Sequence, residues 1–235
     1  MRYLALASDY DGTLAHDGVV DDATIRAAER LIDSGRRLIL VTGRQLPDLQ
    51  SVFPRLDLCE RVVAENGALL YDPATREKRT LAQRPPQSFL DNLRERGAQD
   101  VSVGEVIVDT WRPYEAQVIE AIRDSGLELQ IIFNKEAVMV LPAGVDKMTG
   151  LRAALEALKL SLHNVAGVGD AENDQAFLES CGCSVAVANA IHELKEKADF
   201  VTHGARGAGV VELIDKLIDH DLSDLPAALK DESVL

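Results

Sequence analysis

The chain has 235 residues, 46% of them hydrophobic, and a formal net charge of −14. A chain of this size can bury about 70–75% of its unfolded surface, so we expect a full core in one large domain or in a domain with an insert. The negative charge argues against a nucleic-acid partner, because a phosphate backbone is bound by clustered Lys and Arg. No apolar stretch reaches the length of a membrane span, and the first residues resemble neither a signal peptide nor an anchor.

Strands and helices alternate in the first third of the chain. A short apolar run covers residues 3–7, and residues 22–34 place their apolar side chains on one helical face, ahead of Gly35. Residues 38–41 and 62–64 are short, continuous apolar runs of the kind found in buried parallel strands. This alternation predicts a doubly wound parallel sheet.

The pattern changes in the middle of the chain. Residues 68–81 indicate a hairpin, and Arg84-Pro85-Pro86 interrupts the regular pattern. A break at residues 134–136 separates two apolar runs, which predicts an antiparallel pair and a small α+β layer. The elements expected in this segment are helices at 88–96 and 114–125 and strands at 101–109, 128–133 and 137–141.

The parallel pattern then resumes. The elements expected are helices at 148–160, 173–181 and 209–219 and strands at 165–168, 184–187 and 199–201. We therefore predict an α/β fold, a doubly wound Rossmann-like parallel sheet with a small α+β cap. The expected division is a core of residues 1–83 and 146–220, a cap of residues 84–145 and a tail of residues 221–235.

Polar clusters follow several of these strands. Asp9 and Asp11 end the first strand and share one face of it, so both can address one pocket. Two crowded carboxylates are costly unless a cation or a shared proton relieves their repulsion. An ordinary Asp-Gly turn is the alternative.

Three further clusters stand at equivalent places. Thr42 follows the second strand, Lys147 opens a helix after the insert, and residues 169–174 follow the strand at 165–168. Each has a simpler interpretation: Thr42 as a helix cap, Lys147 as a solvated lysine, and residues 170–174 as an acidic helix start. Their common position on one side of the predicted sheet favours a shared site.

Together these motifs resemble the haloacid dehalogenase superfamily of hydrolases, in its Cof-type branch. The resemblance runs from Leu4 to about Leu217. The short cap is similar to that of archaeal phosphoglycolate phosphatases. The motifs that carry it are Asp9-Tyr10-Asp11-Gly12-Thr13-Leu14, Val41-Thr42-Gly43-Arg44, Glu65-Asn66-Gly67-Ala68, Lys147 and Gly169-Asp170-Ala171-Glu172-Asn173-Asp174.

The resemblance implies a mechanism. Asp9 would attack phosphorus and form an aspartyl-phosphate, and Asp11 would act as general acid and base. Mg²⁺ would be held by Asp9, the backbone carbonyl of Asp11, Asp170 and Asp174. The residues it assigns to phosphate or substrate are Thr42, Gly43, Arg44, Lys147 and Asn173. For Arg44, pairing with an acid such as Glu65 is an open alternative.

We thus expect a cytoplasmic Mg²⁺-dependent phosphatase of a small phosphorylated metabolite, phosphoglycolate or a sugar phosphate. A phosphotransferase resembling phosphomannomutase, or a module of a longer protein, are the alternatives. Substrate identity would lie in the cap, where a ligand rich in hydroxyls needs donors and an aromatic wall. The cap residues of interest are Trp111, Arg112, Tyr114 and Lys135. The three cysteines are expected to be buried thiols, the five histidines show no metal spacing, and the glycine-rich residues 204–209 are expected to form a plain loop.

Overall fold

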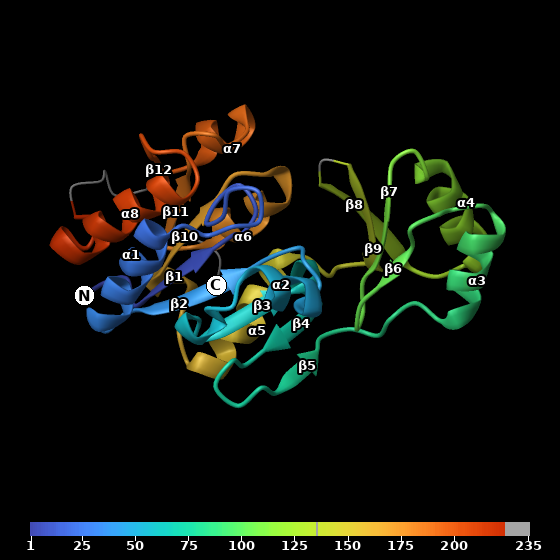
Figure 1. Cartoon of the computed structure of the whole chain (residues 1–235), viewed down its shortest axis with the longest axis horizontal. Helices are drawn as coiled ribbons and strands as arrows, with labels where there is room; N and C mark the ends of the chain where they lie inside the picture. Colours follow the sequence, from blue (N-terminus) through green and yellow to red (C-terminus); the bar gives the residue numbers. More distant parts are fainter. Residues whose placement is uncertain (135, 224–235) are drawn as a thin grey trace, which may run out of the picture.

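The structure, a computed structural model, describes residues 1–134 and 136–223. Within these residues the chain forms two sheets that lie side by side, each with its own helices (Figure 1). The strands of the larger sheet are, in spatial order, β12 (Phe200–Val201), β11 (Cys183–Ala186), β10 (Val165–Gly169), β1 (Ala5–Ser8), β2 (Arg37–Val41), β3 (Arg61–Ala64), β4 (Leu69–Tyr71) and β5 (Lys78–Thr80).

The run from β12 to β3 is parallel, and β4 and β5 complete one edge as an antiparallel hairpin. This confirms the predicted α/β fold and the hairpin within residues 68–81. Strands β1 and β2 occupy the middle of the sheet, where helices cover both faces, so their residues are almost all buried. The carboxyl ends of the parallel strands therefore meet at one edge of the sheet.

Helices pack against the larger sheet in two groups. Helix α1 packs beside α8, and α5 contacts β2, β3, β4 and α6. Asp21 caps α1 by accepting a hydrogen bond from the Thr24 N–H at 2.7 Å, and Gly35 follows the helix with a positive φ of 86°. The α-helices of this layer are α1 (Asp22–Asp33), α2 (Leu46–Val52), α5 (Lys147–Leu158), α6 (Gln175–Ser180), α7 (His192–Lys197) and α8 (Gly207–His220).

The sequence does not predict helices α2 and α7, whose seven and six residues give little helical periodicity. The 3₁₀ turns are η1 (Leu56–Leu58), η2 (Glu65–Gly67), η3 (Leu162–Asn164) and η4 (Glu172–Asp174). The predicted tail begins at residue 221, where Asp221 accepts a hydrogen bond from Arg36 Nη2 at 2.9 Å. Residues 224–235 lie outside the described part of the chain.

The smaller sheet and its helices form a second layer, which we call the cap. Its strands are, in spatial order, β6 (Ser102–Val103), β7 (Val108–Trp111), β9 (Ala137–Pro142) and β8 (Leu129–Asn134), all antiparallel. Helices α3 (Gln87–Glu95) and α4 (Glu115–Ser125) cover one face, through a cluster that includes Phe89, Val118 and Val140. The second sheet agrees with the predicted α+β cap.

One expected element is wrong. Residues 101–109 were predicted as a single strand, but they form β6, a turn and the start of β7. The chain turns back at Gly104, and the N–H groups of residues 105–107 donate to the Glu65 carboxylate rather than to a neighbouring strand. A partner from another part of the chain therefore interrupts an apolar run that looks continuous in sequence.

Candidate active site

The predicted clusters meet at the carboxyl edge of the larger sheet. Asp9 and Asp11 follow β1, Thr42 follows β2, and Asp170 follows β10. Strand β1 pairs with both β2 and β10 in parallel register, so these strand ends are immediate neighbours. The fold thus brings together residues from three distant parts of the chain.

Lys147 lies at the centre of this edge and is 1% exposed. Its Nζ donates to Asp9 Oδ1 and to Asp174 Oδ1, both at 2.5 Å. It is the first residue of α5, whose start is fixed by a capping box between Asp146 and Thr149. Burial opposes its charge, but the carboxylates of Asp174 and Asp9 outweigh that effect and raise the pKa of Lys147. The solvated-lysine alternative is therefore excluded.

Three buried carboxylates cluster here, and two of them, Asp9 and Asp174, contact the ammonium group. Asp9, Asp170 and Asp174 each offer an oxygen within 4.8 Å of the other two. Burial, and then the charge of Asp174, raise the pKa of Asp9 to about 8, against the opposing effect of Lys147. Three carboxylates and one ammonium leave two negative charges when all four are ionised. The cluster thus fits a hard divalent cation such as Mg²⁺, which prefers oxygen ligands.

Neighbouring groups hold two of these carboxylates in place. Thr13 Oγ1 donates to Asp170 Oδ1 at 3.1 Å, and Gly12, with φ +92°, packs so closely that a Cβ there would lie 2.3 Å from Asp170 Oδ2. Asp174 Oδ2 accepts hydrogen bonds from the N–H groups of Asp170 and Ala171, both at 2.9 Å. The Asp-Gly sequence is thus more than a turn, because its glycine makes room for the acidic cluster.

Arg44 contacts two acids. Its Nε and Nη2 donate to the two oxygens of Asp11 at 2.6 and 2.7 Å, and its Nη1 donates to Asp48 at 2.6 Å. The suggested pairing with Glu65 is wrong, because the Glu65 carboxylate is occupied by backbone N–H groups of the cap. The fork shape of the guanidinium suits this two-point contact and orients the Asp11 carboxylate.

Thr42 and Asn173 lie at the same edge with different partners. Thr42 is buried, and its Oγ1 accepts a hydrogen bond from the Arg44 N–H at 3.1 Å, which leaves the hydroxyl proton to donate elsewhere. Asn173 Nδ2 donates to Asn66 Oδ1 at 3.0 Å. Asn173 Oδ1 and Asn66 Nδ2 are buried with no hydrogen-bond partner among the described residues. The structure thus pairs Asn173 with a neighbouring amide.

A cavity of about 540 Å³ lies between this edge and the cap. Its volume falls within the range of about 300–1,000 Å³ that is usual for small-molecule sites. On the core side, Asp9, Asp11, Gly43 and Arg44 line it. Further lining residues are Gln45, Asp48, Ser102, Asp109, Thr110, Trp111, Asn134, Ala137 and Met139.

The pairing of the cap strands explains which side chains face the cavity. Asp109 pairs with Ser102 and Met139, and Trp111 pairs with Ala137, so these residues share one face of the sheet. That face is opposite the one covered by α3 and α4, to which Val108 and Val140 belong. The cap therefore presents a carboxylate, a hydroxyl and an indole toward Asp9.

Sequence reasoning selected Trp111 but missed the polar residues that line the cavity beside it, among them Ser102, Asp109 and the core residue Gln45. Gln45 Nε2 donates to Ser102 Oγ at 2.7 Å and to Asp109 Oδ2 at 2.8 Å, which links core and cap. Asp109 stands two residues before Trp111, so strand alternation could have indicated it. Arg112 and Tyr114 are absent from the described lining of the cavity: Arg112 pairs with Glu115, and Tyr114 packs in the cap core. Lys135 lies outside the described residues.

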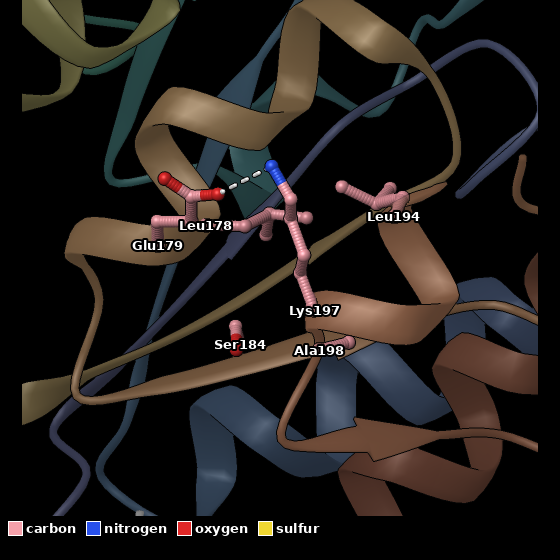
Figure 2. A pocket seen from close by; sticks show the side chains of 6 residues that line it. All are labelled: Leu178, Glu179, Ser184, Leu194, Lys197 and Ala198. Atoms are coloured by element: carbon pink, nitrogen blue, oxygen red, sulfur yellow. Dashed lines mark ion pairs between the residues drawn. The ribbon is translucent and has the colours of Figure 1, made fainter. Parts of the chain in front are cut away.

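A second cavity, between α6 and α7, is far smaller, at about 10 Å³ (Figure 2). Leu178, Leu194 and the ion pair of Lys197 with Glu179 surround it. This space holds about one water molecule, and none of the clustered acids lines it.

Among the described residues, no helix is both long and apolar enough to cross a membrane.

Comparison with known proteins agrees with this arrangement. Residues 6–108 and 98–214 match the haloacid dehalogenase-like hydrolase family. The chain is 31% identical to phosphoglycolate phosphatase 1 of Saccharolobus solfataricus, over 89% of this chain and 93% of that protein. It is also 31% identical to a phosphoglycolate phosphatase of Methanothermobacter thermautotrophicus, over 91% of this chain and 98% of that protein.

Solved structures share the fold. A HAD/Cof-like hydrolase of Plasmodium vivax has a TM-score of 0.79 at 23% identity, covering 93% of this chain and 96% of its own. A protein of Thermoplasma acidophilum has a TM-score of 0.78 at 17% identity, covering 92% of this chain and 98% of its own. The chain belongs to the haloacid dehalogenase-like hydrolases and, within them, to the phosphatases.

Proposed function

We propose that this protein is a Mg²⁺-dependent phosphatase that hydrolyses a small phosphorylated metabolite through an aspartyl-phosphate on Asp9. The observation that carries the proposal is the cluster in which Lys147 bridges Asp9 and Asp174 beside Asp170. Phosphoryl transfer depends chiefly on positioning and on neutralising negative charge. This cluster supplies a nucleophilic carboxylate, a fixed ammonium group and oxygen ligands for a cation.

The proposed roles follow from position. Asp9 lines the cavity and attacks phosphorus with the carboxylate oxygen that Lys147 does not hold. Asp11 also lines the cavity and exchanges protons with the leaving group and the hydrolytic water, oriented by Arg44. The Thr42 hydroxyl and the Lys147 ammonium stabilise the charge on the phosphoryl oxygens.

The metal would be held by Asp9, Asp170, Asp174 and the Asp11 backbone carbonyl. Mg²⁺ bound there neutralises charge on the phosphoryl group. Thr13 and Gly12 act before any substrate arrives, because they fix the Asp170 carboxylate toward the other two acids. Asn173 contributes by pairing with Asn66, which ties the loop of residues 169–174 to the turn that follows β3.

We assign substrate selection to the cap, within residues 84–145. The relatives named above are phosphoglycolate phosphatases, whose names point to a substrate with a carboxylate. The described walls of this cavity instead carry Asp48 and Asp109, while Arg44 is already engaged by acids. A second anionic group would meet like charges there. The cavity therefore favours a leaving group that carries hydroxyls, as in a small sugar or polyol phosphate.

The test compares Asp9→Asn with the exposed control Asp33→Asn on a panel of phosphorylated metabolites that includes phosphoglycolate and small sugar phosphates. We expect Asp9→Asn to lose about 10³-fold or more in kcat while its circular dichroism stays unchanged. Acid quenching of the wild type with a ³²P-labelled substrate should trap label on Asp9. Wild-type turnover by Asp9→Asn, or label on another residue, would refute the assignment.

A further inference from the structure

The turn η2 joins β3 to β4 and has an unusual backbone. Glu65 and Asn66 are both fully buried, with φ angles of +52° and +53°. Residues other than glycine seldom adopt this left-handed conformation, and the surrounding structure must offset its cost. The contacts that offset this cost connect the turn to the cap and to the catalytic edge.

On the cap side, the Glu65 carboxylate accepts three backbone hydrogen bonds. Oε1 accepts from the Glu105 N–H at 2.8 Å, and Oε2 accepts from the N–H groups of Val106 and Ile107 at 2.8 and 2.9 Å. Gly104 fits directly against this carboxylate, since a Cβ there would lie 2.6 Å from Oε1. A core side chain thus binds the β6–β7 turn of the cap through charge-assisted hydrogen bonds.

On the core side, the same turn touches each segment of the candidate active site except β1. The Glu65 N–H donates to the Arg44 carbonyl, and the Asn66 N–H to the Thr42 carbonyl, both at 2.9 Å. Asn66 Oδ1 accepts from Asn173. The third residue, Gly67, packs against the backbone at the start of α5, where a Cβ would lie 1.8 Å from the Asp146 carbonyl oxygen and 3.1 Å from the Lys147 backbone nitrogen.

We propose that Glu65 is a positioning residue that fixes the cap over the catalytic edge. Ile107, one of its three amide partners, is two residues before Asp109 in the chain. Fixing residues 105–107 therefore fixes where Asp109 stands in the cavity wall relative to Asp9. The bond from Gln45 to Asp109 holds the same wall from a second core segment. The effect on turnover rests on the proposed phosphatase function, whereas the anchoring itself does not.

Two variants test this from opposite sides of the contact. Glu65→Gln keeps the shape but removes the charge and places an NH₂ group against backbone donors. Gly104→Ala leaves the core untouched and pushes the cap turn away from the carboxylate. Glu105→Gln is the matched control, because its exposed side chain changes while its backbone N–H still donates to Glu65.

The first measurement is amide hydrogen exchange, which needs no enzymatic activity. We expect the amides of residues 105–107 to exchange at least tenfold faster in both variants and at the wild-type rate in the control.

The second measurement compares acetyl phosphate, whose leaving group is too small to reach the cap, with the metabolite that the wild type hydrolyses best. We expect kcat/KM to fall about 10–100-fold for the metabolite and under threefold for acetyl phosphate.

Unchanged exchange in both variants would overturn the anchoring role. Faster exchange with an equal loss on both phosphates would overturn the positioning role, because Glu65 would then support the catalytic loops in general. A wild type that hydrolyses neither phosphate would refute the proposed function, and the exchange measurement would still decide the anchoring role.

Discussion

Lys147 Nζ lies 2.5 Å from Asp9 Oδ1, although 138 positions separate the two residues in the chain. The contact forms because the chain returns to the larger sheet after the cap, and the side chain of the first residue of α5 reaches the carboxylate that follows β1. A buried charge of either sign is costly without a partner, so each residue stabilises the ionised form of the other. Asp9 and Asp174 therefore depend on Lys147 for the neutralisation of their charge.

Removing that cation should destabilise the protein. Lys147→Met leaves the buried carboxylates of Asp9 and Asp174 without their common partner, and we expect a loss of about 3–5 kcal/mol of unfolding free energy. Chemical denaturation measures the loss. Lys78→Met is the control, because the ion pair of Lys78 with Glu105 is exposed and should contribute little. Equal stability of the two variants would contradict the role assigned to Lys147.

Gly12 should tolerate no side chain. In Gly12→Ala the new Cβ meets Asp170 at 2.3 Å, so we expect the carboxylate to move and kcat/KM to fall by about 10²-fold. Gly97→Ala is a matched control, because Gly97 also has a positive φ, of 83°, but nothing lies within 4 Å of the added carbon. A similar loss of activity in both variants would attribute the effect to backbone strain rather than to Asp170.

Divalent cations should stabilise the folded protein. The acidic cluster carries two negative charges beside Lys147 when all its groups are ionised, which favours a cation. Mg²⁺ at 100 times its Kd should add about 2.7 kcal/mol to the unfolding free energy. Thermal melts with Mg²⁺ and with EDTA measure this, together with loss of activity in EDTA. In Asp170→Asn the stabilisation should largely disappear. Equal stabilisation of the variant and the wild type would place the cation elsewhere.

Stability should fall as pH rises through the range in which Asp109 ionises. Burial raises the pKa of Asp109 from 3.8 to about 6. The hydrogen bond from Gln45 lowers this pKa, and the charge of Glu65 raises it further. The folded protein then holds this proton more tightly than the unfolded chain does. Protonated Asp109 therefore contributes to the unfolding free energy below pH 4, and this contribution is lost as pH rises past 6. Ionisation costs the folded state on the order of 3 kcal/mol.

The Asp109→Asn variant isolates this effect. Its amide oxygen can still accept from Gln45, but it cannot ionise. Urea denaturation should find the variant more stable than the wild type at pH 8 and similar to it at pH 4. The exposed Asp33→Asn change provides the comparison. A higher unfolding free energy of the wild type than of the variant at pH 8 would contradict this prediction, because it would mean that the folded cap stabilises the ionised carboxylate.

The sequence by itself determined the parallel core, the small second layer and the positions of Asp9, Asp11, Thr42 and Asp170 at the ends of buried strands, with Lys147 at the start of a helix. Parallel strands bring their carboxyl ends to one edge, so apolar runs followed by polar residues are sufficient to predict that these side chains meet. Short motifs can be located from the sequence because their residues lie next to each other and next to the end of a strand.

Only the tertiary structure decided which partner each charged residue takes. For Arg44 the sequence left open a contact with substrate or a pairing with an acid such as Glu65. In the fold Arg44 binds Asp11 and Asp48, and Glu65 binds the cap amides. Gln45 and Asp109 are 64 positions apart, and neither belongs to a motif. Hydrogen bonding and ion pairing need contact within about 3 Å, and contact between distant segments is set by packing rather than by local pattern.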